Sequence, residues 1–325
     1  MTVGKPIPSE GTRAKSIKKN QITDVSKQVT HLLEEGSLES LTQGKALYQS
    51  YLKYQWDFYS ELSFQRNAVQ DKLINAIAES CIENFVFANW QRVVSWKYSN
   101  HPLCTIGSTR QFGGRFNIGE DISQSNTLKT FPAFYIAKDQ GTAQVEAFGN
   151  QDRDGKLTVY EVALTNKSSY SCFSISGSLD RIIDLTKKSS LSKFVRLISK
   201  FTIPQSICDS ARRLNIPEPT LVTTTTLLLK SFLAPDWRKE PAQSDIPANS
   251  QIFGQLAYQA GIDGILFRST KTGKDCLAVF PSNFANGNSY IKLDDEPPSK
   301  WIIKMIDSEN FSLCEKNAEQ IKTKK

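Results

Sequence analysis

The sequence lacks the long apolar segments of a membrane protein and several familiar catalytic motifs. No run of about 18 apolar residues occurs, so no segment is expected to cross a bilayer. The N-terminal end has lysines but no apolar core of the kind that defines a secretory signal. Neither the GxSxG turn of serine hydrolases nor the GxxxxGK[ST] phosphate loop is present. These absences argue against a membrane protein, an α/β-hydrolase and a P-loop protein.

Metal ligands are also scarce. The only histidines are His31 and His101, and the six cysteines are scattered without a CxxC pair. A zinc site needs about four such ligands close together, so we expect no metal. The cysteines are interpreted as buried or idle thiols in a reducing compartment, which suggests the cytoplasm of a producing or a target cell.

Composition and charge indicate a globular protein. The chain has 325 residues, of which 39% are hydrophobic and 22% charged, and its net charge is +7. That charge suits an anionic ligand, but the lysines and arginines are spread along the chain. Because no basic stripe interleaved with aromatic residues occurs, the sequence argues against nucleic-acid binding.

The first part of the chain reads as helical. Residues 1–21 are polar and rich in serine and lysine, which predicts a disordered lead. Apolar residues then recur every three to four positions, which predicts helices over residues 22–36, 38–62 and 68–90. We interpret residues 22–91 as a helical accessory module.

A second domain is predicted over residues 92–290, with a C-terminal segment and lysine-rich tail at 291–325. Residues 202–250 are interpreted as an insertion of uncertain structure, because they combine prolines with a polar TTTT run. Elsewhere the patterns predict strands and helices. The expected strands are 93–98, 156–164, 181–186, 264–270 and 276–280, the last two forming a hairpin, and the expected helices are 191–201 and 251–260.

The stretch from residue 107 to 146 combines the groups best suited to chemistry. Gly113 and Gly114 allow a tight turn and a close approach of the backbone to a ligand, and they deliver Arg115. An apolar segment that predicts a buried strand carries Tyr135, and the short helix expected after it carries Glu146.

Four segments in order resemble the RES-domain family, which is named for an arginine, a glutamate and a serine. They are RQFGGRFN (110–117), AFYIAKDQGTAQVE (133–146), RIIDLT (181–186) and AGIDGILFRSTKTGKDCLAVF (260–280). The resemblance covers about residues 92–285. It implies an α+β fold of ADP-ribosyltransferase type, with a mixed β core and surrounding helices, to which this chain adds the N-terminal helical extension.

The family resemblance also implies an activity. Members are best known as toxins of toxin–antitoxin pairs that break down NAD or transfer its ADP-ribose. NAD is therefore the expected substrate, and an antitoxin or immunity protein the expected partner. The main expectation is an NAD glycohydrolase that depletes NAD in a bacterial cell; the alternatives are an ADP-ribosyltransferase and an inactive RES-like binding module.

Carried over by motif, the site residues are Arg115, Tyr135, Glu146 and Ser269, with Gly114 beside the ligand. The resemblance implies that Arg115 binds the diphosphate, Tyr135 stacks on nicotinamide, and Glu146 faces the ribose cation, as carboxylates do in glycosidases. Ser269 would orient the ribose or the glutamate. A further arginine, which the family commonly has about twenty residues before GGR, could be Arg92, and Lys97 is the other candidate.

Each of these residues also has an ordinary structural interpretation. Without the resemblance, Arg115 is a surface turn residue and Tyr135 a core aromatic residue. Glu146 is then a solvated helix residue, and Ser269 a hairpin serine. Spacing alone does not distinguish these roles from those in NAD chemistry.

Overall fold

The computed structural model describes residues 25–122, 128–148, 170–297, 299 and 301–316. The expected lead at 1–21, the expected strand at 156–164 and the last residues of the tail lie outside the described residues. By contacts the chain divides into two compact units. One contains the residues up to Ala68 together with Lys200–Leu221, and the other contains Val69–Ser199 together with Val222 onward.

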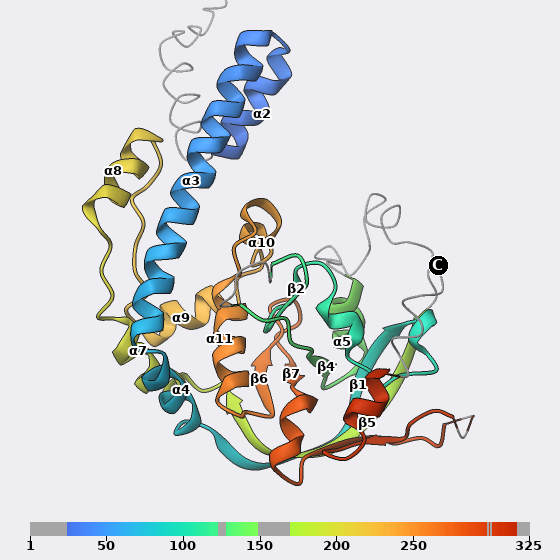
Figure 1. Ribbon diagram of the computed structural model, residues 1–325. Helices are drawn as coiled ribbons and strands as arrows, with labels where there is room; N and C mark the ends of the chain where they lie inside the picture. Colours follow the sequence, from blue (N-terminus) through green and yellow to red (C-terminus); the bar gives the residue numbers. More distant parts are fainter. Residues whose placement is uncertain (1–24, 123–127, 149–169, 298, 300, 317–325) are drawn as a thin grey trace, which may run out of the picture. The chain divides into compact units, whose positions relative to one another are not determined.

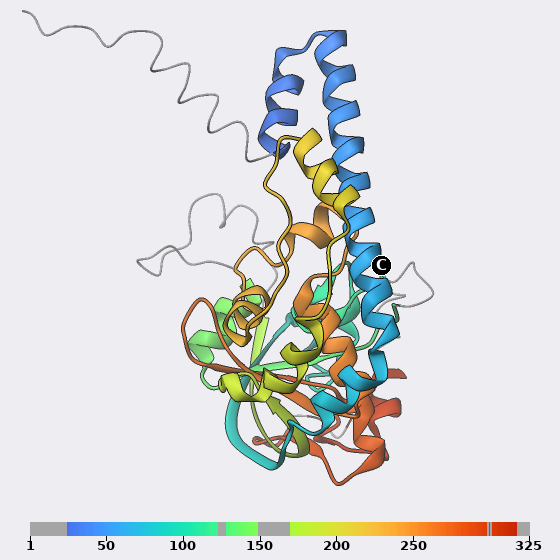
Figure 2. The same cartoon turned by 90° about the vertical axis from the view of Figure 1, so that its left-hand side faces the viewer.

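The first unit is built on a pair of helices. α2 (Val25–Glu35) and α3 (Leu38–Ala68) run side by side, and Gly36 between them has a φ of 70°, which suits glycine (Figure 2). Both helices were expected from the apolar spacing, although α3 continues past the predicted end at residue 62 to Ala68.

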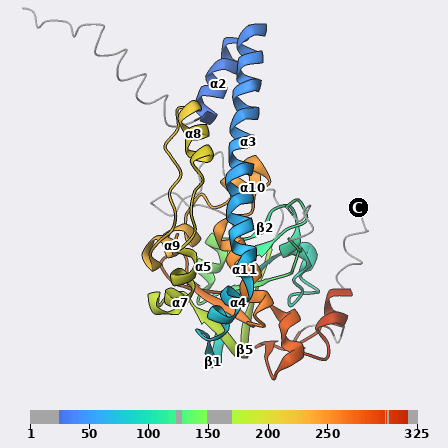
Figure 3. The same ribbon diagram turned by 60° about the vertical axis from the view of Figure 1, so that its left-hand side comes forward.

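The first part of the expected insertion belongs to this unit. α8 (Gln205–Arg213) lies beside α3 (Figure 3), where Tyr54 packs with Ile207, Ala211 and Leu214. The amide of Gln65 donates to the carbonyl of Thr202 at 2.8 Å and accepts from its N–H at 2.9 Å. These contacts show that residues 200–221 form a packed part of the helical unit.

The second unit contains a seven-stranded sheet within the described residues (Figure 1). The strand order is β1-β4-β7-β6-β5-β8-β9, and β1 also pairs with β5, so the first five strands close into a ring. All pairs are antiparallel except β5 with β6. The strands are β1 (Ile82–Ser95), β4 (Phe134–Ala137), β5 (Tyr170–Asp184), β6 (Gly264–Arg268), β7 (Asp275–Val279), β8 (Tyr290–Leu293) and β9 (Met305–Ile306).

The helix expected over residues 68–90 is wrong in its second half. α4 (Gln70–Ala78) is helical, but the chain then enters β1, which pairs with β5 along most of its length. The register shifts between Phe87 and Trp90, and Asn89 there has a φ of 59°. This bulge places Phe87 and Trp90 in the core at a spacing of three residues, which imitates helical periodicity.

The remaining elements of the second unit agree better with the sequence. The strand expected at 181–186 overlaps the end of β5, which stops at Asp184. The predicted hairpin is β6–β7, and the helix expected at 251–260 is α11. Among the helices of the described residues, none is both long and apolar enough to cross a membrane. The helices are α5 (Gln140–Phe148), α7 (Ser192–Ile198), α9 (Thr225–Phe232), α10 (Lys239–Ser244) and α11 (Asn249–Gln259).

Candidate functional site

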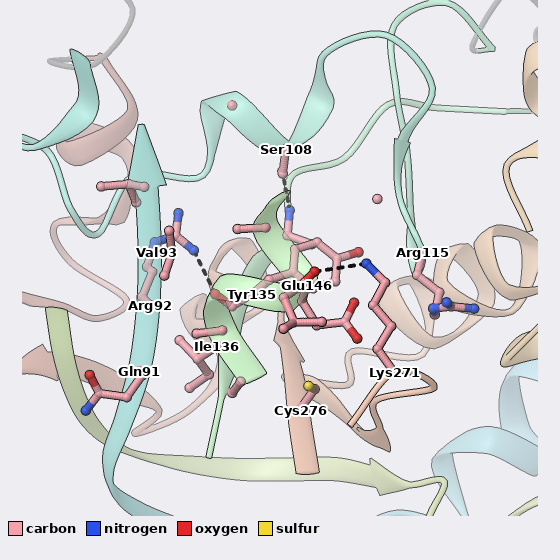
Figure 4. Close-up of a pocket in the computed structure, with 18 of the residues that line it drawn as sticks. Gln91, Arg92, Val93, Ser108, Arg115, Tyr135, Ile136, Glu146, Lys271 and Cys276 are labelled. Atoms are coloured by element: carbon pink, nitrogen blue, oxygen red, sulfur yellow. Dashed lines mark hydrogen bonds between the residues drawn. The ribbon is translucent and has the colours of Figure 1, made fainter. Parts of the chain in front are cut away.

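A cavity of about 1130 Å³ opens within the second unit (Figure 4). It is lined from β1, β4 and α5, from the glycine loop before β4, from the turn of the β6–β7 hairpin and from residues 235–238. This volume slightly exceeds the roughly 300–1,000 Å³ of small-molecule sites, so the cavity has room for a dinucleotide.

The GGRFN segment forms a tight two-stranded turn, in which β2 (Gly113–Gly114) pairs with β3 (Asn117–Ile118). Gly113 has a φ of 83°, and a Cβ there would lie 2.4 Å from the carbonyl oxygen of Asn117. The buried amide of Gln251 in α11 donates to the carbonyls of Phe112, Gly114 and Asn117 at 2.6, 3.1 and 3.1 Å. The turn is therefore fixed from both sides, and Arg115 leaves it in a defined direction.

Tyr135 holds this loop through its hydroxyl group. The hydroxyl accepts from the N–H of Phe116 at 2.9 Å and donates to Oδ1 of Asn117 at 2.8 Å. A Cβ on Gly114 would lie 2.5 Å from the same hydroxyl, so this glycine makes room for Tyr135. Burial raises the pKa of Tyr135 well above its usual value. The expected stacking of Tyr135 on nicotinamide stays a prediction; the contacts in the structure indicate a role in holding the loop.

Arg115 lines the cavity although it is only 8% exposed. Its Nη1 donates to the carbonyls of Phe232 and Ala234 at 2.8 and 3.0 Å. Burial lowers the pKa of Arg115, and the nearby charge of Glu146 opposes that change. Within the described residues Nε and Nη2 have no hydrogen bond, so they remain as donors toward a ligand in the cavity.

Glu146 and Ser269 meet directly. The carboxylate of Asp139 accepts from the N–H and hydroxyl of Thr142 and so begins α5, whose last turn carries Glu146. The hydroxyl of Ser269, which follows β6 and is 3% exposed, donates to Oε1 of Glu146 at 2.5 Å. The same hydroxyl accepts from the N–H of Lys271 at 3.2 Å, which orients its proton toward the carboxylate.

Four cationic side chains share the cavity with this carboxylate. Arg92, Arg115, Arg238 and Lys271 line the cavity, and Glu146 is the single carboxylate among the described residues that line it. Nζ of Lys271 donates to the carbonyl of Val145 at 2.9 Å, beside Glu146 in Figure 4. Burial lowers the pKa of Lys271, and the charge of Glu146 opposes this. A site with this balance of charge favours an anionic ligand.

Of the two candidates for the further arginine, Arg92 lines the cavity and Lys97 does not. The guanidinium of Arg92 donates to the carbonyls of Tyr135 and Cys104 at 3.2 and 2.7 Å and lies 3.8 Å from the ring centroid of Phe134. Burial lowers its pKa to about 10. Arg92 therefore ties β1 to β4 at the wall of the cavity.

The structure thus brings together Gly114, Arg115, Tyr135, Glu146 and Ser269, the five residues that the sequence suggested. Sequence reasoning missed Trp237 and Arg238, which line the cavity from the segment after α9, and Lys271 in the hairpin turn. The adjacent aromatic and cationic residues of PDWR (235–238) were the available signal. Among the described residues no group of three or more histidine, cysteine or carboxylate side chains could hold a metal ion.

Comparisons with known proteins gave a family match and a structural match. The family model described as RES domain matches residues 90–301. A comparison with curated proteins gave no match. Among solved structures, the chain is similar to one in the Mycobacterium tuberculosis MbcT–MbcA toxin–antitoxin complex, at 15% identity and a TM-score of 0.37. That match covers 75% of this chain and 97% of the other.

Proposed function

The chain belongs to the RES-domain family, and from this premise we propose that it is a toxin that hydrolyses NAD to nicotinamide and ADP-ribose. The observation that carries the proposal is the carboxylate of Glu146, held by Ser269 in a dinucleotide-sized cavity whose other charged lining residues, among those described, are all cations. Both halves of this arrangement have a task in the reaction.

The bond to be broken joins C1′ of ribose to the pyridinium nitrogen of nicotinamide. Its electron pair goes to that nitrogen, which leaves as neutral nicotinamide, so the leaving group needs no general acid. The ribose becomes oxocarbenium-like, and Glu146 stabilises this positive charge as carboxylates do in glycosidases. A water oxygen then bonds to C1′ and loses a proton, which yields ADP-ribose.

The cations bind the other part of the substrate. The diphosphate of NAD is an anion, and an arginine can donate two hydrogen bonds to phosphate oxygens. Arg115 keeps two of its donors for this purpose, while Lys271 supplies a second positive charge. Ser269 acts as a positioning residue, because its hydroxyl fixes one carboxylate oxygen of Glu146.

Release of nicotinamide from NAD by the purified protein tests the proposal. We expect Glu146→Gln to lower the rate roughly 10²- to 10³-fold, the usual effect of losing one group that stabilises transition-state charge. Ser269→Ala should lower the rate less, because the carboxylate remains. Glu83→Gln is the matched control, since Glu83 is exposed on β1 and does not line the cavity. Equal rates for wild type and Glu146→Gln would refute the proposed chemistry.

The fate of labelled ADP-ribose separates the alternatives. Label in free ADP-ribose supports hydrolysis, and label on a protein indicates that a protein nucleophile replaced water. Binding of NAD without turnover indicates an inactive binding module.

In cells, we expect expression of the wild type to deplete cytoplasmic NAD and arrest growth, and the Glu146→Gln variant to do neither. We also propose an antitoxin or immunity protein as partner. Co-expression with the product of a neighbouring gene should then relieve the arrest, and failure of every neighbour to do so would refute this part.

A further inference from the structure

Trp237 is the aromatic ring in the cavity that is best placed to contact a ligand. Four aromatic residues of the described chain line the cavity, and Tyr98 and Phe267 are only 8% and 4% exposed. Tyr135 uses its hydroxyl to hold the glycine loop. Trp237 is half-buried, and its neighbours at the cavity wall are Pro235 and Arg238.

The segment that carries Trp237 is firmly attached. Arg115 donates to the carbonyls of Phe232 and Ala234, immediately before this segment. Phe232 is 1% exposed, and its ring centroid lies 4.7 Å from that of Phe253 in α11. A ring presented from an anchored segment loses little freedom when a ligand stacks on it, which favours binding.

The charges near Trp237 select the kind of ring. The guanidinium carbons of Arg115 and Arg238 lie 5.6 and 5.0 Å from the centroid of the Trp237 ring. A pyridinium cation would be repelled by these two positive charges, whereas a neutral purine with an attached phosphate would not. The cation of the substrate belongs beside Glu146, the carboxylate in the described lining of the cavity.

We propose that Trp237 and Arg238 form the subsite for the adenosine-phosphate half of the dinucleotide. The indole stacks on the purine, and the guanidinium of Arg238 binds phosphate. This inference rests on the proposed function for the identity of the ligand. It places the two ends of NAD, with the purine at residues 237–238 and nicotinamide at Glu146.

Calorimetric titration of the full-length protein with adenosine, AMP and nicotinamide riboside tests each half separately. We expect Trp237→Ala to weaken the binding of AMP and of adenosine roughly 5- to 150-fold, the range for loss of one base–aromatic stack. Trp237→Phe should retain most of the affinity, because phenyl still offers a π-face. Arg238→Gln should weaken the binding of AMP but not that of adenosine, which has no phosphate. All three variants should bind nicotinamide riboside as the wild type does.

Trp301→Ala is the matched control, because Trp301 is 90% exposed and does not line the cavity.

In turnover, Trp237→Ala should raise KM for NAD and leave kcat nearly unchanged, as expected when uniform binding energy is removed. If AMP binds Trp237→Ala as tightly as wild type, or if KM is unchanged, the subsite is refuted while NAD hydrolysis stands. If Trp237→Ala binds AMP more weakly than wild type does, but wild type releases no nicotinamide from NAD, the subsite stands and the proposed function fails. Wild type that binds neither AMP nor NAD refutes both.

Discussion

Replacement of Tyr135 by phenylalanine distinguishes two roles for this residue. The change keeps the ring, which stacking on nicotinamide requires, and removes only the hydroxyl, which holds the glycine loop. The N–H of Phe116 then loses its acceptor in a place where Phe116 itself is fully buried. Leaving a buried donor without a partner costs about 1–3 kcal/mol. Asn117 is less affected, because its Oδ1 still accepts from the N–H of Gly114 at 3.0 Å.

Tyr98→Phe is the matched control for this change. Tyr98 is also buried at the cavity wall, but its hydroxyl makes no hydrogen bond within the described residues. Removing that hydroxyl leaves no new unpaired group, so Tyr98→Phe should be as stable as wild type or slightly more stable. Because the two substitutions remove the same atom, their difference isolates the hydrogen bonds of Tyr135.

Thermal unfolding and nicotinamide release together decide between the two roles. A loss of about 1–3 kcal/mol lowers Tm by about 2–12 °C in a domain of this size. We expect this fall for Tyr135→Phe, together with slower nicotinamide release because Arg115 loses its fixed direction. If Tyr135→Phe has the same Tm as Tyr98→Phe, the hydroxyl of Tyr135 does not hold the loop. Full activity at full stability would instead favour the stacking role.

Two further substitutions test the packing and the charge of the site. In Gly254→Ala the new Cβ would lie 2.0 Å from the carbonyl oxygen of Phe116, so we expect a loss of about 1–3 kcal/mol in denaturant titration. The helical control Gly141→Ala meets nothing closer than 3.4 Å and should not destabilise; equal effects would contradict the packing argument. For Lys271, burial lowers the pKa below 10.5, so its positive charge is lost at a lower pH than that of an exposed lysine. The affinity for ADP-ribose should therefore fall as pH rises toward 10.5, and Lys271→Met should remove that part of the pH dependence; an unchanged profile would show that Lys271 does not bind the anion.

The local patterns predicted the parts of the second unit whose structure depends on near neighbours in the chain. The hairpin of β6 and β7 follows from two apolar runs around a polar turn, and Gly273 in that turn has a φ of 72°. α11 ends before Gly261, whose φ of 67° is the usual stop for a helix. The resemblance then grouped the five site residues. Four of them line one cavity in the structure, and the fifth, Ser269, is hydrogen-bonded to Glu146.

The parts that failed depend on contacts distant in the sequence. The bulge at Asn89 is stabilised by pairing with β5, more than eighty residues later, and no local pattern signals such a register shift. Residues 202–250 divide between the two units, which an interpretation as one insertion could not express. Trp237 and Arg238 were missed for the same reason, since the packing of Phe232 on α11 and the hydrogen bonds from Arg115 bring them to the cavity.

Within the described residues, the hydrogen bonds of the site form two groups on either side of the cavity. One group joins Gln251, Tyr135 and Asn117 to the glycine loop and continues through Arg115 to the segment that carries Trp237. The other joins Ser269 to Glu146. The first group positions Arg115 and the segment of Trp237, and the second positions the carboxylate together with Lys271. On the proposed function, the two ends of the dinucleotide therefore contact separate parts of the fold. We therefore expect that binding of the adenosine half and the proposed cleavage at the nicotinamide half can be impaired independently, which is why separate ligand halves and separate variants are the appropriate tests.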